Sequence, residues 1–165
     1  MRITAEEVEA LLRPVCRRDR IQLCEVSVSG KPSLPYIKVV VDYEETNITI
    51  DDCVRITKEL QDLLDMGPHP IPNYRLEVSS PGIGFPLTEV WQFKKNAGKW
   101  IVPPKGAVSK EPVLLVGVKE DGELMIRGSE GVRSVSLEQW KGARVTLANS
   151  VSHKMMSNQR KVRNR

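Results

Sequence analysis

Hydrophobic residues near the start of the chain recur every three or four positions. This spacing, which places side chains on one face of a helix, is shown by Val8, Leu11, Leu12 and Val15. Thr4 and Glu7 precede the stripe at the spacing of a capping box, in which each side chain accepts a hydrogen bond from the other residue's backbone amide. We therefore predict a helix from Thr4 to about Arg18. Pro14 should kink or end it, because proline cannot donate the backbone hydrogen bond.

Alternation of apolar and polar residues replaces the helical spacing further along the chain. It covers residues 24–29 and 37–42 and predicts two strands. In the first of them, Cys24 shares the apolar face with Val26 and Val28. The Gly-Lys-Pro-Ser sequence between the two runs is typical of a turn, and a third alternating run at residues 74–79 predicts one more strand.

A second helix is predicted before the third strand. Thr49 can cap its first turn, and Asp51 and Asp52 would meet the positive end of the helix dipole. Apolar residues recur at helical spacing as far as Leu64, and a Gly-Pro pair at 67–68 ends the pattern. The first half therefore has the order α-β-β-α-β, with two helices covering one face of a three-stranded sheet, which is a small α+β domain.

Residues 79–86 interrupt both kinds of periodicity with two prolines and two glycines. The charge balance also changes there, from net −4 over residues 1–80 to net +8 over residues 81–165. We therefore expect a domain boundary at about residue 86, with domains at 1–86 and 87–150 and a tail at 151–165. Such an asymmetry favours an anionic or acidic partner for the second domain.

The second half is predicted to be rich in short strands. They are expected at residues 100–102, 113–119, 124–128, 132–136 and 145–148. Turn sequences separate several of them at hairpin distances, and residues 137–140 are expected to form one helical turn. Five short antiparallel strands in about 60 residues favour a small closed or half-closed barrel. The tail has no acidic residue and few apolar ones, so it is expected to be a disordered basic extension.

The pattern contains no constellation that is typical of an enzyme or a metal site. His69 lies between two prolines and His153 lies in the tail, so neither is expected to act as a general base in a cleft. The three cysteines form no C-x-x-C pair and are expected to be reduced thiols in the core. The Asp51-Asp52 pair is explained by its place in a helix first turn. We therefore predict a protein that is no enzyme and has no cofactor and no metal.

Composition favours a folded protein outside the membrane. Hydrophobic residues make up 40% and charged residues 28% of the chain, which is ordinary for globular proteins. The longest aliphatic run, Val113–Val116, is far shorter than a membrane span. The first residues lack the apolar stretch of a secretory signal. The sequence thus predicts a cytoplasmic location and no membrane partner.

The candidate binding residues are the basic side chains of the second half. They are Lys94, Lys95, Lys99, Arg127, Arg133, Lys141 and Arg144, together with Arg160, Lys161 and Arg163 of the tail. Such side chains neutralise phosphates and release counterions. Trp91 and Trp100 flank the lysines and are expected to anchor the core of the domain. Stacking on unpaired bases is the alternative for them.

Several stretches of the sequence resemble the bacterial ribosome maturation factor RimP family. They are Ile50–Cys53 at the start of a helix, Leu63–Asp65, Ile71–Pro72, Tyr74–Gly82, Pro86–Leu87 and Trp140–Val145. The Leu-Glu-Val-Ser-Ser-Pro-Gly sequence at 76–82 is the most specific of these. The chain departs from the family at Ile83-Gly84-Phe85, which replaces a charged pair, so contacts made through that pair are not carried over. The proline-bounded segment 103–112 also differs from the usual basic loop.

The resemblance implies a cytoplasmic protein with an α+β domain followed by an SH3-like barrel. It also implies transient, non-catalytic binding to the maturing small (30S) ribosomal subunit, with 16S rRNA and a small-subunit ribosomal protein as partners. The chain is expected to be a monomer that does not bind DNA. The basic residues of the second half would then position phosphates.

Two alternatives to an assembly factor remain open at the level of sequence. One is an Sm-like barrel that binds single-stranded RNA, which an exposed aromatic side chain on the barrel would favour. The other is an enzyme that acts on RNA, which the missing acid–base set disfavours.

Overall fold

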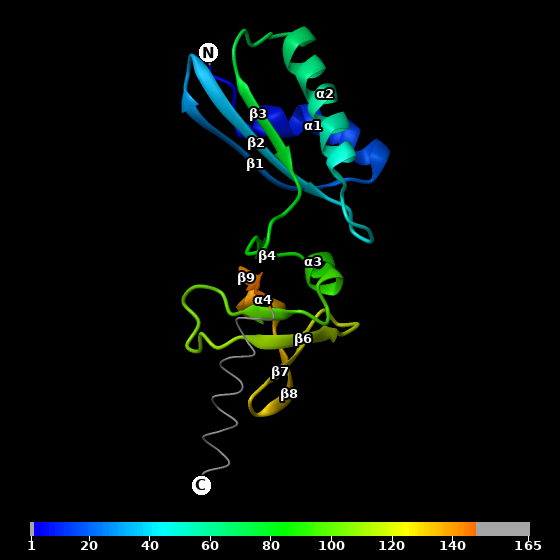
Figure 1. Ribbon diagram of the computed structural model, residues 1–165, viewed down its shortest axis with the longest axis vertical. Helices are drawn as coiled ribbons and strands as arrows, with labels where there is room; N and C mark the ends of the chain where they lie inside the picture. Colours follow the sequence, from blue (N-terminus) through cyan, green and yellow to red (C-terminus); the bar gives the residue numbers. More distant parts are fainter. Residues whose placement is uncertain (1, 148–165) are drawn as a thin grey trace. The chain divides into compact units, whose positions relative to one another are not determined.

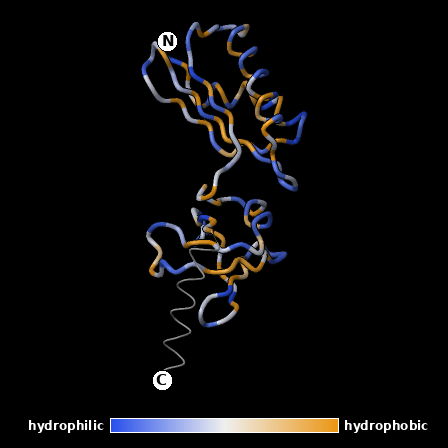
Figure 2. Tube along the Cα trace, in the orientation of Figure 1, coloured by the Kyte–Doolittle hydropathy of each residue, from blue (hydrophilic) through white to orange (hydrophobic). Residues whose placement is uncertain are grey.

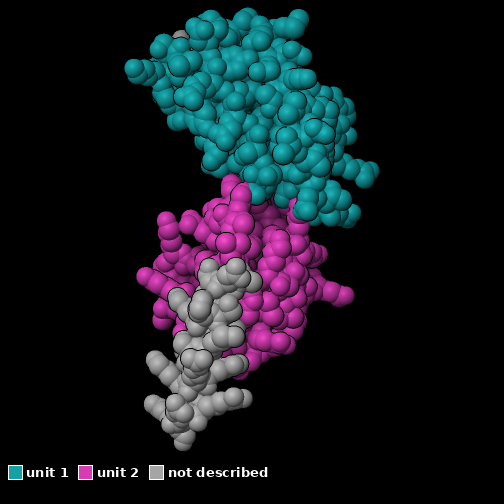
Figure 3. All heavy atoms as spheres, in the orientation of Figure 1, with its two compact units in different colours: residues 1–81 teal, residues 82–165 magenta. Residues whose placement is uncertain are grey.

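The computed structural model describes residues 2–147 and divides the chain into two compact units, residues 1–81 and 82–165 (Figures 1 and 3). The division falls within the glycine- and proline-rich segment 79–86. The tail residues Arg160, Lys161 and Arg163 lie outside the described part of the chain. None of the helices within residues 2–147 has the length and hydrophobicity that a bilayer crossing requires.

The first unit has the predicted element order. Its elements are α1 (Ala5–Asp19), β1 (Gln22–Lys31), β2 (Leu34–Asp42), α2 (Ile50–Met66) and β3 (Arg75–Ser79). The sheet has the order β1-β2-β3, in which β1 and β2 form an antiparallel hairpin and β3 runs parallel to β2. β3 is therefore an edge strand of this sheet.

Both helices of the first unit cover the same face of the sheet (Figure 1). Ile37, Val39 and Val41 alternate along the central strand β2, so they point to one face. All three are fully buried in one cluster with residues of both helices, among them Leu12 of α1 and Leu60 of α2. Figure 2 shows the matching alternation of hydrophobic and hydrophilic positions along the strands.

Helix α1 begins as predicted, and it continues past its proline. The Glu7 amide donates to Thr4 Oγ1 at 3.2 Å and the Thr4 amide to Glu7 Oε2 at 2.9 Å, which confirms the capping box. Of the two effects expected of Pro14, a kink or an end, the end is excluded, because α1 continues to Asp19. Pro14 is exposed while Val15 beside it is buried, so core packing offsets the one backbone hydrogen bond that proline removes.

The apolar face of β1 differs from the prediction at Cys24. The pairing with β2 shifts between Leu23 and Glu25, which marks a β-bulge at Cys24. An extra residue reverses the alternation of faces, so Leu23 joins Val26 in packing against the core. Cys24 is half-buried at the bulge instead.

Helix α2 has the predicted bounds. The Asp52 amide donates to Thr49 Oγ1 at 3.1 Å, and the Thr49 amide donates to Asp52 Oδ2 at 2.9 Å. At the other end, a Cβ on Gly67 would lie 2.5 Å from the carbonyl oxygen of Leu63. Glycine therefore fits where the chain turns out of the helix.

The second unit contains a six-stranded antiparallel sheet. Its elements are β4 (Pro86–Leu87), α3 (Val90–Lys95), β5 (Trp100–Val102), β6 (Val113–Val118), β7 (Leu124–Gly128), β8 (Gly131–Val135), α4 (Leu137–Trp140) and β9 (Ala143–Val145). The strand order is β4-β9-β5-β6-β7-β8. Four of the five predicted strands and the helical turn at 137–140 are present, whereas the last strand is β9 and shares only Val145 with the predicted range 145–148. The chain as a whole is of the predicted α+β class. β4 and α3 were not predicted from the pattern, because two and six residues are too few to show a period.

The core of the second unit is built around two aromatic side chains. Phe93 of α3 is completely buried and Trp140 of α4 is 8% exposed. Around them pack Leu87, Ile101, Val113, Leu115, Leu124, Ile126 and Ala143. The core thus joins both short helices to the sheet.

Candidate nucleic-acid interface

The acidic residues of the first unit are partly used to hold its two helices together. Arg55 Nη1 of α2 lies 2.6 Å from Asp19 Oδ2 of α1, and Arg18 Nη2 of α1 lies 2.7 Å from Glu59 Oε1 of α2. Hydrogen bonds from Arg18 and Arg55 hold the pKa of Asp19 far below its usual range. These four charged side chains therefore stabilise the contact between α1 and α2. No ligand is needed to account for them.

Several other titratable groups singled out in the sequence are likewise held in packing or capping, whereas His69 is exposed and His153 lies outside the described residues. Within residues 2–147, no group of three or more His, Cys, Asp or Glu side chains is arranged to hold a metal ion. Cys16 and Cys53 pack against the core, and burial raises the pKa of each thiol. Hydrogen bonds from Thr49 lower the pKa of Asp52, in keeping with its place in the helix cap.

The three candidate lysines nearest the start of the second unit gather at the end of α3. Lys94 and Lys95 form its last turn, where positive charge is favourable to the helix dipole. The Asn96 amide closes the helix by donating to the Gln92 carbonyl at 3.2 Å, and Lys99 Nζ donates to Asn96 Oδ1 at 3.0 Å. Lys94 and Lys99 are exposed. We call Lys94, Lys95 and Lys99 the α3 lysine group.

A second group of candidates lies on the sheet. Directly opposed residues of antiparallel strands share a face, and the pairs Trp100–Leu114, Leu114–Arg127 and Arg127–Val132 form one continuous row across β5 to β8. Their neighbours Ile101, Leu115 and Ile126 are completely buried, so the row occupies the face turned away from the core. We call Trp100, Leu114, Arg127 and Val132 the outer row.

Arg144 belongs to the same outer face as this row. It is paired with Val102 on β5, two residues from Trp100 and therefore on the same side of the sheet. Arg144 is half-buried, whereas Arg127 is exposed. The outer face thus combines two arginines with partly exposed apolar side chains.

The two remaining candidates are placed differently. Arg133 of β8 is paired with Ile126, so it projects from the opposite face to Arg127. Lys141 Nζ lies 2.9 Å from Glu138 Oε1, and this carboxylate raises the pKa of Lys141. The structure therefore distributes the described candidates over several surfaces of the second unit.

The expectation that Trp91 and Trp100 anchor the core is wrong. Both are half-buried, and neither belongs to the core cluster. On β5 the inward position is taken by Ile101, which directs Trp100 to the outer face. On α3 the buried positions are taken by Gln92 and Phe93.

A comparison with known protein families found a match for the first unit. Residues 11–84 match the family model of the RimP N-terminal domain. The matched range begins within α1 and includes every later helix and strand of the first unit. It also contains the segment 76–82, on which the sequence resemblance chiefly rests.

Proposed function

From the premise that this chain carries the N-terminal domain of the RimP family, a family of ribosome maturation factors, we propose that it binds the assembling small (30S) ribosomal subunit. It assists late maturation of the subunit there without catalysing a reaction. The observation that carries the proposal is the family match over residues 11–84, together with the α-β-β-α-β fold of that range.

A factor of this kind acts through differential affinity. A non-covalent partner shifts an equilibrium only as far as it binds one state better than the other. The chain would therefore bind the immature subunit more tightly than the mature one. It would leave as the local RNA reaches its final fold.

The second unit is the proposed contact for 16S rRNA and a small-subunit ribosomal protein, and we propose the SH3-like barrel class for it. Two of its basic surfaces support contact with an anionic partner, namely the α3 lysine group and the outer face with Arg127 and Arg144. Lys141, Arg133 and the tail residues Arg160, Lys161 and Arg163 are proposed as auxiliary phosphate contacts. We propose a monomer with a cytoplasmic location.

One observation favours a second candidate function, an Sm-like module for single-stranded RNA. Trp100 lies in the outer row with Arg127, from which Leu114 separates it, and a face that carries both an aromatic ring and a cation is a suitable platform for unpaired bases. This alternative predicts tight binding of short oligouridylate and assembly into rings. The maturation-factor proposal predicts a monomer by light scattering and much weaker binding of free oligonucleotides than of small subunits.

Removing two positive charges from α3 tests its part in the interface. The double variant Lys94→Ala/Lys95→Ala is expected to bind small subunits more weakly, with the slope of log affinity against log salt reduced by about one per lost phosphate contact. Co-sedimentation with small subunits at several salt concentrations measures the slope.

Two exposed lysines of the same unit provide the control for this experiment. Lys105 and Lys110 lie in the segment between β5 and β6, outside the candidate set. The variant Lys105→Ala/Lys110→Ala should keep the slope of the parent protein. If the Lys94→Ala/Lys95→Ala variant also keeps the slope of the parent protein, Lys94 and Lys95 do not contact phosphate.

A further inference from the structure

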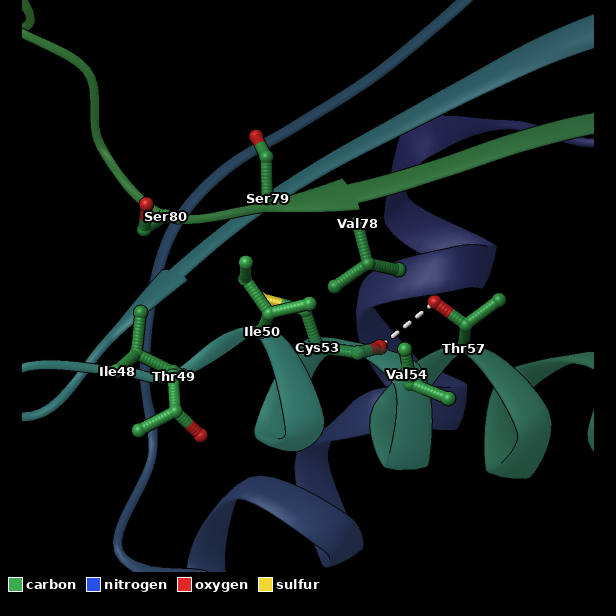
Figure 4. A pocket seen from close by; sticks show the side chains of 9 residues that line it. All are labelled: Ile48, Thr49, Ile50, Cys53, Val54, Thr57, Val78, Ser79 and Ser80. Atoms are coloured by element: carbon green, nitrogen blue, oxygen red, sulfur yellow. Dashed lines mark hydrogen bonds between the residues drawn. The ribbon is translucent and has the colours of Figure 1, made fainter.

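The first unit contains a groove that no part of the proposed function uses. It lies between the start of α2 and the end of β3 and has a volume of about 300 Å³ (Figure 4). Ile50, Cys53 and Val54 border it from the helix, and Val78 points into it from the strand. Ser79 and Ser80 lie where the strand leaves the groove. The groove is therefore lined mainly by apolar side chains, and Thr49, Thr57, Ser79 and Ser80 complete its lining.

The helix side of the groove carries apolar side chains that the core does not use. Ile50 is 84% exposed and Val54 is 47% exposed. They are four residues apart and share a face of α2. The buried residues that α2 contributes to the core are Ile56, Leu60 and Leu64. Covering Ile50 and Val54 would remove apolar surface from water, which favours a partner at this position.

The strand side of the groove is the free edge of a sheet. Within the described residues, β3 pairs only with β2. An edge strand presents backbone N–H and C=O groups to a further strand. An extended segment added to β3 would direct alternate side chains to one face, and a side chain on the helix-covered face would enter the groove beside Val78.

Charge around the groove determines the kind of segment that fits. Residues 39–54 contain five acidic side chains, and the basic residues Lys38 and Arg55 stand immediately outside this range. The acidic residues are Asp42, Glu44, Glu45, Asp51 and Asp52. Glu44, Glu45 and Asp51 are exposed, whereas Asp52 is engaged by the helix cap. The first 80 residues as a whole have a net charge of −4, so the surroundings favour a basic partner and disfavour nucleic acid.

We propose that this groove binds an extended, lysine- or arginine-rich protein segment, which adds to β3 as a further strand and inserts an apolar side chain between α2 and β3. Strand addition of this kind gives affinity through the backbone and specificity through alternate side chains. The site lies in the first unit and binds protein. Its failure would therefore leave the proposed binding of the second unit to RNA untouched.

A peptide titration of the full chain tests the proposal. The probe is a synthetic octapeptide of alternating lysine and valine, and the control probe alternates glutamate and valine. We expect the basic peptide to shift the NMR methyl signals of Ile50, Val54 and Val78 until they saturate, and the acidic peptide to leave them unchanged. Shifts that depend on protein concentration without any peptide would indicate a second copy as the occupant and would overturn the proposal.

Two exposed substitutions on one helix separate the groove from general charge attraction. The variant Ile50→Ser/Val54→Ser keeps every acidic residue and is expected to weaken binding of the basic peptide at least tenfold, the fold-change that even partial burial of two aliphatic side chains implies. Met66→Ser, at the far end of α2 where Met66 is 83% exposed, should bind the peptide like the parent protein. Equal affinity in all three proteins would show that the peptide is held by surface charge alone, and the groove would be no binding site.

Discussion

The variant Phe93→Ala is expected to lose about 3–5 kcal/mol of stability in the second unit, the range for deleting a buried aromatic side chain. Phe93 is completely buried, and it is the only apolar buried residue of α3. A helix of six residues is not stable by itself in water. Without this anchor, α3 would lose its attachment to the sheet, and the α3 lysine group would lose its fixed position.

The distribution of aromatic residues allows the two units to be followed separately. All three tryptophans, Trp91, Trp100 and Trp140, lie in the second unit. Urea unfolding followed by tryptophan fluorescence therefore measures that unit. Circular dichroism at 222 nm chiefly follows α1 and α2, which have 15 and 17 residues.

The control for this variant is a neighbour on the same helix. Val90 is 39% exposed, and Val90→Ala should change stability by no more than about 0.5 kcal/mol. A loss of less than about 1 kcal/mol in Phe93→Ala would contradict the place of Phe93 at the centre of the core. So would an equal loss in the helical signal of the first unit.

Gln92→Leu is expected to cost the second unit about 1–3 kcal/mol, although it replaces a buried polar side chain by an apolar one. Gln92 is 6% exposed. Its Oε1 accepts hydrogen bonds from the backbone amides of Thr88 and Glu89 at 2.8 and 2.9 Å, and from Thr88 Oγ1 at 3.2 Å. Leucine would leave these donors at the start of α3 without that acceptor.

The conservative variant Gln92→Glu separates this hydrogen-bond role from the effect of packing. Glutamate keeps an oxygen at the same position, and a negative charge is favourable near a helix N-terminus. It should therefore be more stable than Gln92→Leu in urea unfolding followed by tryptophan fluorescence. If leucine proves as stable as the parent and glutamate is the less stable variant, the backbone amides of Thr88 and Glu89 do not depend on this side chain.

The fold of the first unit could be predicted because its signals are local. The capping residues Thr4 and Thr49, the helical stripes and the alternating strands all stand within a few residues of the features they determine. The departures arise where tertiary packing decides. Burial of Val15 carries α1 past Pro14, and the bulge at Cys24 exchanges the faces of β1, which no window of the sequence reveals.

The second unit and its binding surfaces were less predictable for two reasons. β4 and α3 are too short to show a period, and their positions depend on Leu87 and Phe93 reaching a core formed by distant strands. The basic residues could be identified by type, but register decides which face each one occupies. Arg127 and Arg133 are six residues apart in the sequence and project from opposite faces because a hairpin turn lies between them.

The groove beside β3 was not indicated by the sequence. Ile50 and Val54 belong to the general apolar pattern of α2, and only the structure shows that they face the open side of an edge strand. The acidic run around them was visible as charge. Only the fold shows that this acidic run is next to residues that line an apolar groove.

The most direct test of the proposed function is co-sedimentation of the full chain with three particles at about physiological ionic strength, at which exposed charges are screened beyond about 8 Å. The particles are immature small subunits, mature small subunits and large subunits. We expect retention on small subunits, stronger on the immature ones, and little on large subunits. Equal retention on all three would mean that the basic half binds any polyanion, and no retention on small subunits would contradict a role in their maturation.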